Sequence, residues 1–595
     1  MLYPTLREET TDRQMVDVFS GYNHNLRIGD GEFYDMKNMT SSDYPVLSSR
    51  CARGKYTLGD PTKPVAMIEK DTLCFVDGKD FFCNGTRITD LDLEEETEER
   101  KKQLVSMGAY VIIMPDKKYI NTANLEDRGD IEAVFESSEP VTFSMCRENG
   151  EGYGDVQAGN EAPKEPNDGE MWVDTSSSPN SLKMWSASSG MWVGIASVYV
   201  KISCAGIDKK FNVYDGVELS GLTGQLDMGN DDKYEVEELA ALEGAAVVWG
   251  KGDDYIVVVG VLSTMRTVHS KITVSRLMPE MDYVIECGNR LWGCKYGQAR
   301  NGQVVNELYG SKLGDFKNWN CSMGISTDSW AVPVGTDGAF TGAFSYLGYP
   351  VFFKENHLHK IYISSTAAHQ ATDTPCNGVQ KGCSRSLAMV GNTLYYKSRN
   401  GVCAYDGSLP TEISQALGNV SYFNAVSGGI GNKYYISMAD ADNAYNLFVY
   451  DAGKGMWHRE DALQVDYFAK CRNELYAIAD DQILAMLGGD ESFENTVEWM
   501  VETGLIGLNT PDMKYISKLI LRMQLPQGSF MRVSAEYDSS GRWVQLFDIR
   551  GQGMRAFTLP IKPVRCDHIR LRLEGDGQVK LFSITKIIEQ GSDVR

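Results

Sequence analysis

The chain has 595 residues, and at the usual size of a domain this length predicts about three to five domains. Apolar residues make up 42% and charged residues 23%, with 30 Tyr and 58 Gly, which excludes a disordered chain. Its 81 acidic and 58 basic residues give a formal net charge of −23. This balance excludes the wrapping of DNA phosphates by a general basic surface.

Neither the N-terminus nor any internal stretch reads as a membrane or export signal. Residues 1–14 (MLYPTLREETTDRQ) have no basic segment followed by an apolar one, so we expect no secretory signal and synthesis for the cytoplasm. The longest apolar stretch, residues 255–262, is interrupted by Gly260 and is far shorter than the roughly 20 residues of a membrane span. We therefore expect no membrane span.

One short pattern, a polar turn followed by an aliphatic or aromatic strand, recurs seven times. Four of the six intervals between copies measure 37 to 44 residues, and the other two measure 59 and 181. A four-stranded propeller blade repeats about every 40 to 50 residues. The spacing predicts an all-β fold with a seven-bladed β-propeller; the alternative is a plain β-sandwich with chance spacing. The copies are marked by Leu73, Tyr110, Leu291, Pro350, Leu394, Tyr434 and Leu475.

One helix is predicted, between the first two copies. In residues 93–105 (LEEETEERKKQLV) acidic residues precede basic ones by about four positions, the order that favours i,i+4 pairing and suits the helix dipole. Its charges are expected to face solvent.

The interval of 181 residues predicts an inserted β region between blades 2 and 3. Residues 138–198 begin with a Gly, Pro and Asn-rich linker and continue as a hairpin module, and residues 199–275 alternate as in a small β domain. The propeller then comprises residues 1–137 and 276–489. Longer alternating strands in residues 490–595 predict a C-terminal β-sandwich.

Thirteen Cys are scattered along the chain. An odd number without dense spacing favours reduced thiols over a disulfide framework. Cys376 and Cys383 (CNGVQKGC) are the one pair that the sequence marks for a test.

Candidate catalytic and metal-binding residues are few. His357 and His359 would share one face of a strand, but no neighbouring ligand completes a metal set, so packing or hydrogen bonding is favoured. His458 beside Glu460 and Asp461 suggests an oriented imidazole, although an ordinary turn cluster is favoured because no nucleophile motif accompanies it. Nucleotide, zinc and nucleophile-elbow motifs are absent. The sequence predicts no catalytic residue, no cofactor-binding residue, no metal ligand and no enzymatic activity.

Three turns share an aromatic residue, a polar turn and a Trp: WSASSGMW from Trp185, YDAGKGMW from Tyr450 and YDSSGRW from Tyr537. Such hairpins place aromatic residues opposite each other across two strands. They superficially resemble the Asp-box turns of sialidase-type propellers, but the spacing of that motif is not met.

Several stretches resemble β-propeller structural proteins of bacteriophage tails, of the nozzle, tail-tubular or stabilisation type. The N-terminal ones are FSGYNHNLRIGDGEFYDMKNM (residues 19–39) and YPVLSSR (residues 44–50). The central ones are NRLWGCKYG (residues 289–297) and ELYGSKLGDFKNW (residues 307–319), and FFKENHLHKIY (residues 352–362) adds another. The hairpin module from Met171 also looks like small modules of tail proteins.

The resemblance implies a virion component assembled in the bacterial host cytoplasm, as a homo-oligomeric ring at the tail or neck. Expected partners are other tail or neck proteins, with genomic DNA only as a transient passenger during ejection. The negative charge is compatible with DNA sliding past without sticking. The alternatives are a carbohydrate-active β-propeller enzyme and an adhesin that binds glycans through exposed Trp and Tyr.

Overall fold

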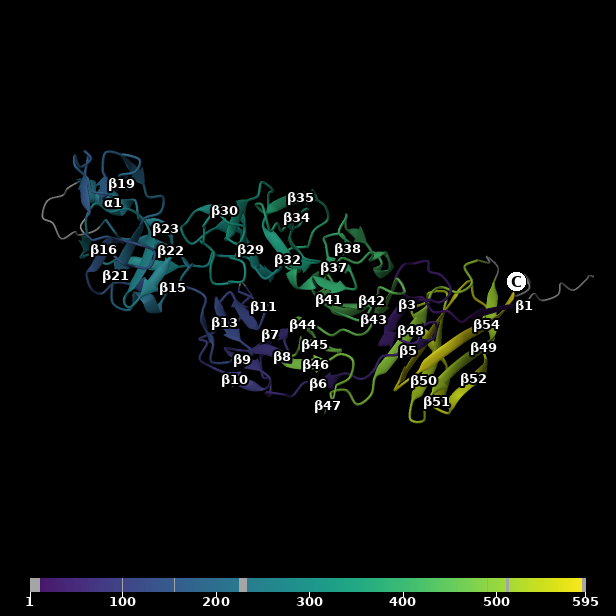
Figure 1. Cartoon of the computed structure of the whole chain (residues 1–595). Coiled ribbons are helices and arrows are strands. Elements are labelled where there is room, and N and C mark those ends of the chain that lie inside the picture. Colours follow the sequence, from purple (N-terminus) through teal and green to yellow (C-terminus); the bar gives the residue numbers. More distant parts are fainter. Residues whose placement is uncertain are drawn as a thin grey trace, which may run out of the picture.

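The computed structural model describes residues 11–98, 100–154, 156–223, 233–489, 491–509 and 513–590. Within these ranges the fold is nearly all β, as predicted, and α1 (Lys233–Ala240) is the one α-helix. No helix of the described part combines the length and the apolar character of a membrane span. The molecule is elongated, with many small sheets in its middle and a further β region at each end (Figure 1).

The middle of the molecule contains seven groups of antiparallel strands, taken here in chain order as the first to seventh sheets. The first consists of β7 (Pro64–Glu69), β8 (Leu73–Asp77), β9 (Asp80–Cys83) and β10 (Thr86–Ile88). The second consists of β11 (Gln103–Met107), β12 (Tyr110–Met114), β13 (Lys118–Asn121) and β14 (Arg128–Asp130). The third consists of β28 (Tyr283–Glu286), β29 (Leu291–Gln298), β30 (Val304–Gly310) and β31 (Trp330–Pro333).

Four more groups follow without interruption. The fourth consists of β32 (Phe340–Tyr346), β33 (Tyr349–Lys354), β34 (His357–Tyr362) and β35 (Gln370–Pro375). The fifth consists of β36 (Ala388–Val390), β37 (Thr393–Lys397), β38 (Val402–Tyr405) and β39 (Thr411–Glu412). The sixth consists of β40 (Phe423–Ile430), β41 (Lys433–Ala439), β42 (Tyr445–Asp451) and β43 (Met456–Arg459). The seventh has β44 (Tyr467–Cys471), β45 (Glu474–Ala479) and β46 (Gln482–Ala485), to which β6 (Gly54–Lys55) and β47 (Glu491–Ser492) are added.

Neighbouring sheets meet mainly through their first strands. Strand β7 contacts β11, β11 contacts β28, and β28 contacts β32. The short 3₁₀ turn η2 (Ser384–Ser386) lies between the fourth and fifth sheets and touches β32, β37 and β40. Strand β36 contacts β40, β40 contacts β44, and β44 contacts β7 of the first sheet. The series of contacts between neighbouring sheets is therefore closed, because the seventh sheet contacts the first.

The seven copies of the repeated pattern are the second strands of these sheets: β8, β12, β29, β33, β37, β41 and β45. Second strands are paired on both sides and largely buried, which explains their regular apolar pattern. In five of the seven sheets the turn before the second strand has two residues. Gly391 and Gly431 occupy such turns with φ of 62° and 57°, a conformation that two-residue hairpin turns require.

The helix predicted for residues 93–105 is wrong. The described residues up to 102 are irregular, and β11 begins at Gln103. Leu93 and Leu104 are both buried in the core beneath the first and second sheets. Burial of these two side chains outweighs the weak helical stabilisation available from exposed charge pairs.

Between β14 and β28 the chain forms three sheets whose strands, within the described ranges, pair only with one another. One has the order β15-β27-β22-β23, another β24-β25-β21-β16-β26, and the third β17-β18-β19-β20. Their bounds are β15 (Ala133–Glu136), β16 (Val141–Cys146), β17 (Gln157–Gly159), β18 (Met171–Asp174), β19 (Ser181–Ser186), β20 (Met191–Gly194), β21 (Tyr199–Ser203), β22 (Gly216–Ser220), β23 (Gly244–Val247), β24 (Gly250–Gly252), β25 (Tyr255–Val259), β26 (Arg266–Val268) and β27 (Thr273–Arg276). This inserted region forms one end of the molecule (Figure 1).

The C-terminal region contains two groups of strands around one buried core. Four N-terminal strands take part: β1 (Thr11–Val16), β3 (Glu32–Lys37), β4 (Met39–Thr40) and β5 (Leu47–Ser49). One group has the order β4-β5-β54-β49-β52, with β1 also paired to β54; the other has the order β3-β48-β53-β50-β51. Their alternating apolar residues, such as Leu519 and Leu521 of β49 and Val533 of β50, share one core. The bounds are β48 (Glu498–Thr503), β49 (Lys514–Leu525), β50 (Phe530–Tyr537), β51 (Trp543–Arg550), β52 (Gly553–Pro560), β53 (Ile569–Asp576) and β54 (Lys580–Gln590).

The N-terminal strands tie this region to the seven sheets. They are β1 (Thr11–Val16), β2 (Gly21–Tyr22), β3 (Glu32–Lys37), β4 (Met39–Thr40) and β5 (Leu47–Ser49). Strand β2 pairs with β43 of the sixth sheet and with β3, and β3 pairs with β48. One ten-stranded sheet therefore runs from the sixth sheet into the C-terminal region. Residues 1–137 are grouped with the propeller on their sequence pattern alone, and that pattern predicts none of this pairing.

Candidate functional site: a central cavity and two joints

A cavity of about 1460 Å³ lies where the first strands of the sheets converge. Its wall includes residues of β11, β28, β32, β40 and β44, so five of the seven sheets contribute to it, together with η2. Polar and charged side chains make up much of this wall.

Ion pairs organise one part of the wall. The Lys117 Nζ lies 2.9 Å from Glu132 Oε1 and 3.0 Å from Glu280 Oε1, and Arg300 approaches the same two carboxylates. Burial would raise the pKa of Glu280, but the hydrogen bond and charge of Lys117, together with Arg300, hold that pKa below its usual value. A general acid for glycoside hydrolysis requires a shift in the opposite direction.

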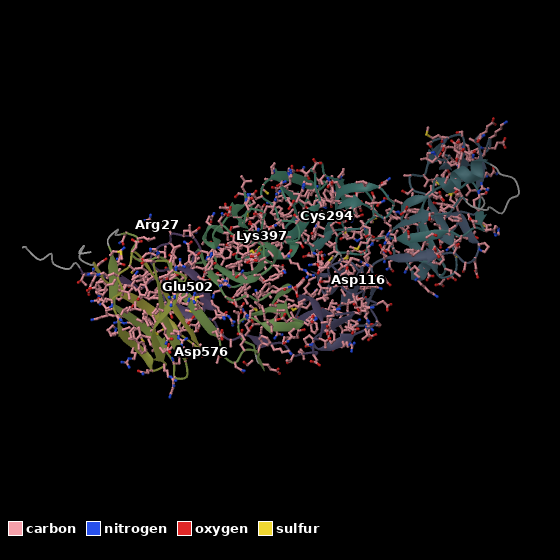
Figure 2. All side chains as sticks on the ribbon, turned by 180° about the vertical axis from the view of Figure 1, so that it is seen from behind. Arg27, Asp116, Cys294, Lys397, Glu502 and Asp576 are labelled. Carbon is pink, nitrogen blue, oxygen red and sulfur yellow. The ribbon has the colours of Figure 1, made fainter. Side chains whose placement is uncertain are left out.

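Two further contacts fix the wall. Lys102 forms a buried ion pair with Asp116, which lies within the group of seven sheets, far from Glu502 in the C-terminal region (Figure 2). Arg385, just after Cys383, donates to Glu96 Oε2 at 3.0 Å and lies 4.9 Å from the ring centre of Tyr467. These pairings place carboxylates of the wall directly beside cations.

The first joint connects the sixth and seventh sheets with the C-terminal region. Arg53 donates to Asp461 Oδ2 and to Glu460 Oε2, each at 2.7 Å. Arg50 donates to both oxygens of Glu494 at 2.6 and 2.8 Å. Burial would raise the pKa of Asp461, but the charge and hydrogen bond of Arg53 hold it below its usual value. The joint is a buried network of two guanidinium groups and three carboxylates.

Asn38 completes this joint. Its amide oxygen accepts from Arg50 Nε at 2.9 Å, and its amide nitrogen donates to the carbonyl of Glu498 at 2.7 Å. Its backbone N–H donates to the carbonyl of Glu460 at 2.7 Å. Asn38 itself has φ of 56°, a left-handed conformation that Asn tolerates better than most residues.

The second joint connects the inserted region with the third sheet. Asp215 forms a buried ion pair with Arg276 and accepts from Asn318 Nδ2 at 3.0 Å. The Asn318 side-chain oxygen accepts from the backbone N–H of Gly216 at 2.8 Å. Lys312 donates to the carbonyl of Tyr214 at 3.0 Å and lies 5.3 Å from the centre of its ring.

The histidines singled out from the sequence do not converge on a metal site. The imidazole of His359 is buried and lies 2.8 Å from Thr336 Oγ1, whereas His357 lies 2.9 Å from Asp373. Burial lowers the pKa of His359 to about 4. Among the described residues no group of three or more His, Cys, Asp or Glu is arranged to hold a metal ion. Each of the two imidazoles lies within hydrogen-bonding distance of a neighbouring side chain.

The oriented imidazole suggested for His458 is wrong. His458 is buried in β43, and within the described residues neither ring nitrogen has a hydrogen-bond partner. Burial lowers its pKa to about 3, with Lys433 acting in the same direction. Glu460 and Asp461 bind the arginines of the first joint instead. The neighbourhood of His458 in the sequence does not reveal these ion pairs, because Arg53 lies about 400 residues earlier in the chain.

The aromatic turns pack as cross-strand pairs in two of the three cases. Trp185 lies opposite Trp192 with ring centres 5.6 Å apart, and Tyr450 lies opposite Trp457 at 5.0 Å. In the third turn Trp543 lies opposite Glu536 and is covered by Arg572 at 4.0 Å. All thirteen cysteines, Cys376 and Cys383 included, are free thiols.

No family model and no curated protein matches the chain. Among solved structures it is similar to an exo-β-1,3-galactanase from Phanerochaete chrysosporium, with 8% identity, a TM-score of 0.21, and coverage of 51% of this chain and 94% of that one. An engineered GH43 glycoside hydrolase matches with 9% identity, a TM-score of 0.19, and coverage of 52% and 99%. Raptor from Chaetomium thermophilum matches with 8% identity, a TM-score of 0.25, and coverage of 74% and 30%.

The prediction that the protein has no enzymatic activity is corrected by these matches, because two of the three structures are glycoside hydrolases. The absence of familiar catalytic motifs was a weak basis for it. Carboxylates that act together in glycoside hydrolysis come from separate strands, so they leave no local sequence pattern.

Proposed function

We propose that the protein is a structural component of a bacteriophage tail, a nozzle or tail adaptor that forms a ring around the DNA channel. In this proposal the seven sheets are the blades of a β-propeller and the C-terminal strands form a β-sandwich. The four-stranded meander of each of the first six sheets and the contacts that lead from β44 back to β7 support the propeller. The two facing groups of strands around one core support the sandwich.

The position of the resembling stretches carries the proposal. Residues 19–39 and 44–50 include β2, β3 and β5, and they contain Asn38 and Arg50 of the first joint. Residues 307–319 include Lys312 and Asn318, which build the second. Three of the stretches that resemble phage tail proteins thus contribute to attaching the end regions, whereas residues 289–297 and 352–362 lie within the third and fourth sheets.

Fixed joints suit a protein that holds neighbours in place. A buried network of charges and hydrogen bonds fixes one geometry, because any other leaves charges buried without partners. The inserted region and the C-terminal region lie at opposite ends of the molecule (Figure 1). Each would contact a neighbouring copy or another tail or neck protein, and heterologous contacts of this kind close into rings. Assembly would take place in the host cytoplasm and the product would reside in the virion.

Mass measurement tests the ring. Native mass spectrometry of the purified full chain, and quantitative proteomics of purified particles, should give the same integral number of copies greater than one. A single copy in each mature particle would overturn the ring. Absence of the chain from purified particles would overturn the tail assignment itself.

The alternative function is carbohydrate cleavage or binding, and the central cavity is the observation that favours it. Its wall brings Asp116, Glu132, Glu280 and Asp282 together from separate segments of the chain. Incubation of the full chain with aryl glycosides and a panel of bacterial polysaccharides tests this reading. Release of reducing sugar that is lost in Glu280→Gln, but retained when Glu498 on the C-terminal region is changed to Gln, would favour the alternative over the tail component.

A further inference from the structure

Two cysteines of the first sheet lie directly opposite each other. Cys74 in β8 and Cys83 in β9 are register partners, and their Sγ atoms are 3.2 Å apart. Both are free thiols in the structure. Cys376 and Cys383, the pair marked by the sequence, lie outside the strands and are not register partners. Cys383 Sγ instead accepts the backbone N–H of Ala425.

The backbone between the two cysteines suits a cross-link. Strands β8 and β9 are joined by a two-residue turn, and Asp77 is paired with Asp80 at its base. Pairs in an antiparallel ladder alternate, starting with a hydrogen-bonded pair at such a turn. Counting outward places Cys74 and Cys83 at a non-hydrogen-bonded pair. There the Cα atoms lie about 4.5 Å apart, within the range of about 4.4 to 6.8 Å that disulfides span.

The two thiols differ in reactivity. Cys74 is completely buried, whereas Cys83 retains 7% of its exposure. The hydrogen bond from Cys74, assisted by the charge of Lys70, lowers the pKa of Cys83, while the same hydrogen bond and burial raise the pKa of Cys74. Cys83 is therefore the thiolate that attacks first, because the thiolate is the nucleophile in thiol–disulfide exchange.

We propose that Cys74 and Cys83 are a redox site that closes to an intramolecular disulfide on contact with a small oxidising disulfide such as oxidised glutathione. The Cys83 thiolate attacks the glutathione disulfide, forming a mixed disulfide and releasing one glutathione. The Cys74 sulfur then attacks Cys83 Sγ and displaces the second glutathione. Two protein thiols lose two electrons, glutathione disulfide gains them, and the two protons end on the released glutathione thiols.

The cross-link would lie where the first sheet packs against the seventh. Phe75 and Phe82, the neighbours of the two cysteines, stack at 4.8 Å and pack against Cys471 and Ile483 of the seventh sheet. The first and seventh sheets are those whose contact joins the beginning and end of the series. A disulfide there fixes the register of the β8–β9 hairpin in an oxidising environment and releases it in a reducing one.

Peptide mapping tests the site in the intact chain. The folded protein is treated with oxidised glutathione, quenched with acid, and labelled with a maleimide in denaturant. Trypsin cuts after Lys70, Lys79 and Arg87, so each cysteine lies in its own peptide. We expect these two peptides to be joined, two of the thirteen thiols to be lost, and the intact mass to fall by about 2 Da. Reduction should restore both thiols.

Two variants sharpen the result. Cys83→Ser should abolish the joined peptide, and Cys383→Ser, which removes another buried thiol, should leave it unchanged. A persistent glutathione adduct on Cys83 in the wild type would overturn the proposal, as would maleimide label on both Cys74 and Cys83 after oxidation. Because these outcomes are read in the wild-type protein, they do not depend on how well either variant folds.

Discussion

Arg53 and Glu460 form an ion pair in which both side chains are almost completely buried, with Nη2 2.7 Å from Oε2. The two residues are separated by most of the chain, and their contact joins the N-terminal segment to the connection between the sixth and seventh sheets. Such a pair is costly to break, since removal of one partner leaves an uncompensated charge in the interior.

Arg53→Met should therefore lower the free energy of unfolding by about 3–5 kcal/mol. Chemical denaturation followed by tryptophan fluorescence measures this. The matched control is Lys37→Met, which removes the exposed ion pair with Glu498 and should cost less than about 1 kcal/mol. Equal losses in the two variants would contradict a special role for the first joint.

Gly216→Ala should weaken the second joint. A Cβ at this position would lie 2.5 Å from the backbone carbon of Asn320 and 2.5 Å from the backbone nitrogen of Cys321, so the inserted region must move away. Overpacking of this kind costs about 1–3 kcal/mol. We expect faster proteolysis within residues 133–276, measured by mass spectrometry of the fragments. Gly335→Ala, where a Cβ meets nothing within 4 Å, should leave the cleavage rate unchanged.

Arg290→Lys should loosen the loop that follows β30. Arg290 is buried and donates to the carbonyls of Ser311, Ser326 and Asp328 at 2.8, 2.6 and 2.6 Å. A lysine ammonium cannot reproduce this planar set of donors, and each carbonyl left unpaired costs about 1–3 kcal/mol. Hydrogen exchange of residues 311–328 should rise at least tenfold. Arg300→Lys, at a half-exposed ion pair, serves as the control.

Stability should fall as the pH drops from neutrality, with His458 responsible for part of the slope. Burial lowers the pKa of His458 from 6.5 to about 3. Between these values the unfolded chain binds a proton that the folded protein does not, so stability is complete above pH 6.5 and decreases toward pH 3, by at most about 1.4 kcal/mol per pH unit.

His458→Phe should flatten this dependence between pH 6.5 and 4.5 in thermal unfolding scans. Below pH 4 a second loss should remain in the variant, because the lowered pKa of Asp461 supplies stability that disappears only when this carboxylate is protonated. An unchanged slope between pH 6.5 and 4.5 in the variant would contradict the role of His458.

Local sequence patterns were sufficient to predict the second strand of each of the seven sheets. Most second strands follow a two-residue turn, as at Gly391 and Gly431, and are buried along most of their length, so their sequences carry both a turn signal and an apolar run. In residues 93–105, by contrast, the local charge pattern predicted a helix that the structure does not contain. The charges indicate only which side chains face solvent. The conformation is determined by the burial of Leu93 and Leu104.

The sequence by itself determined the all-β class, the recurring strands and the interruption of the repeat, because turn chemistry and apolar alternation act over a few residues. Only the tertiary structure decided that Arg53 meets Glu460, that Asn318 holds Gly216, and that β2 joins the sixth sheet to the C-terminal region. It also decided that Cys74 faces Cys83. These contacts depend on the register of strands and on segments far apart in the chain, and polar residues that pair across such distances leave no periodic signal.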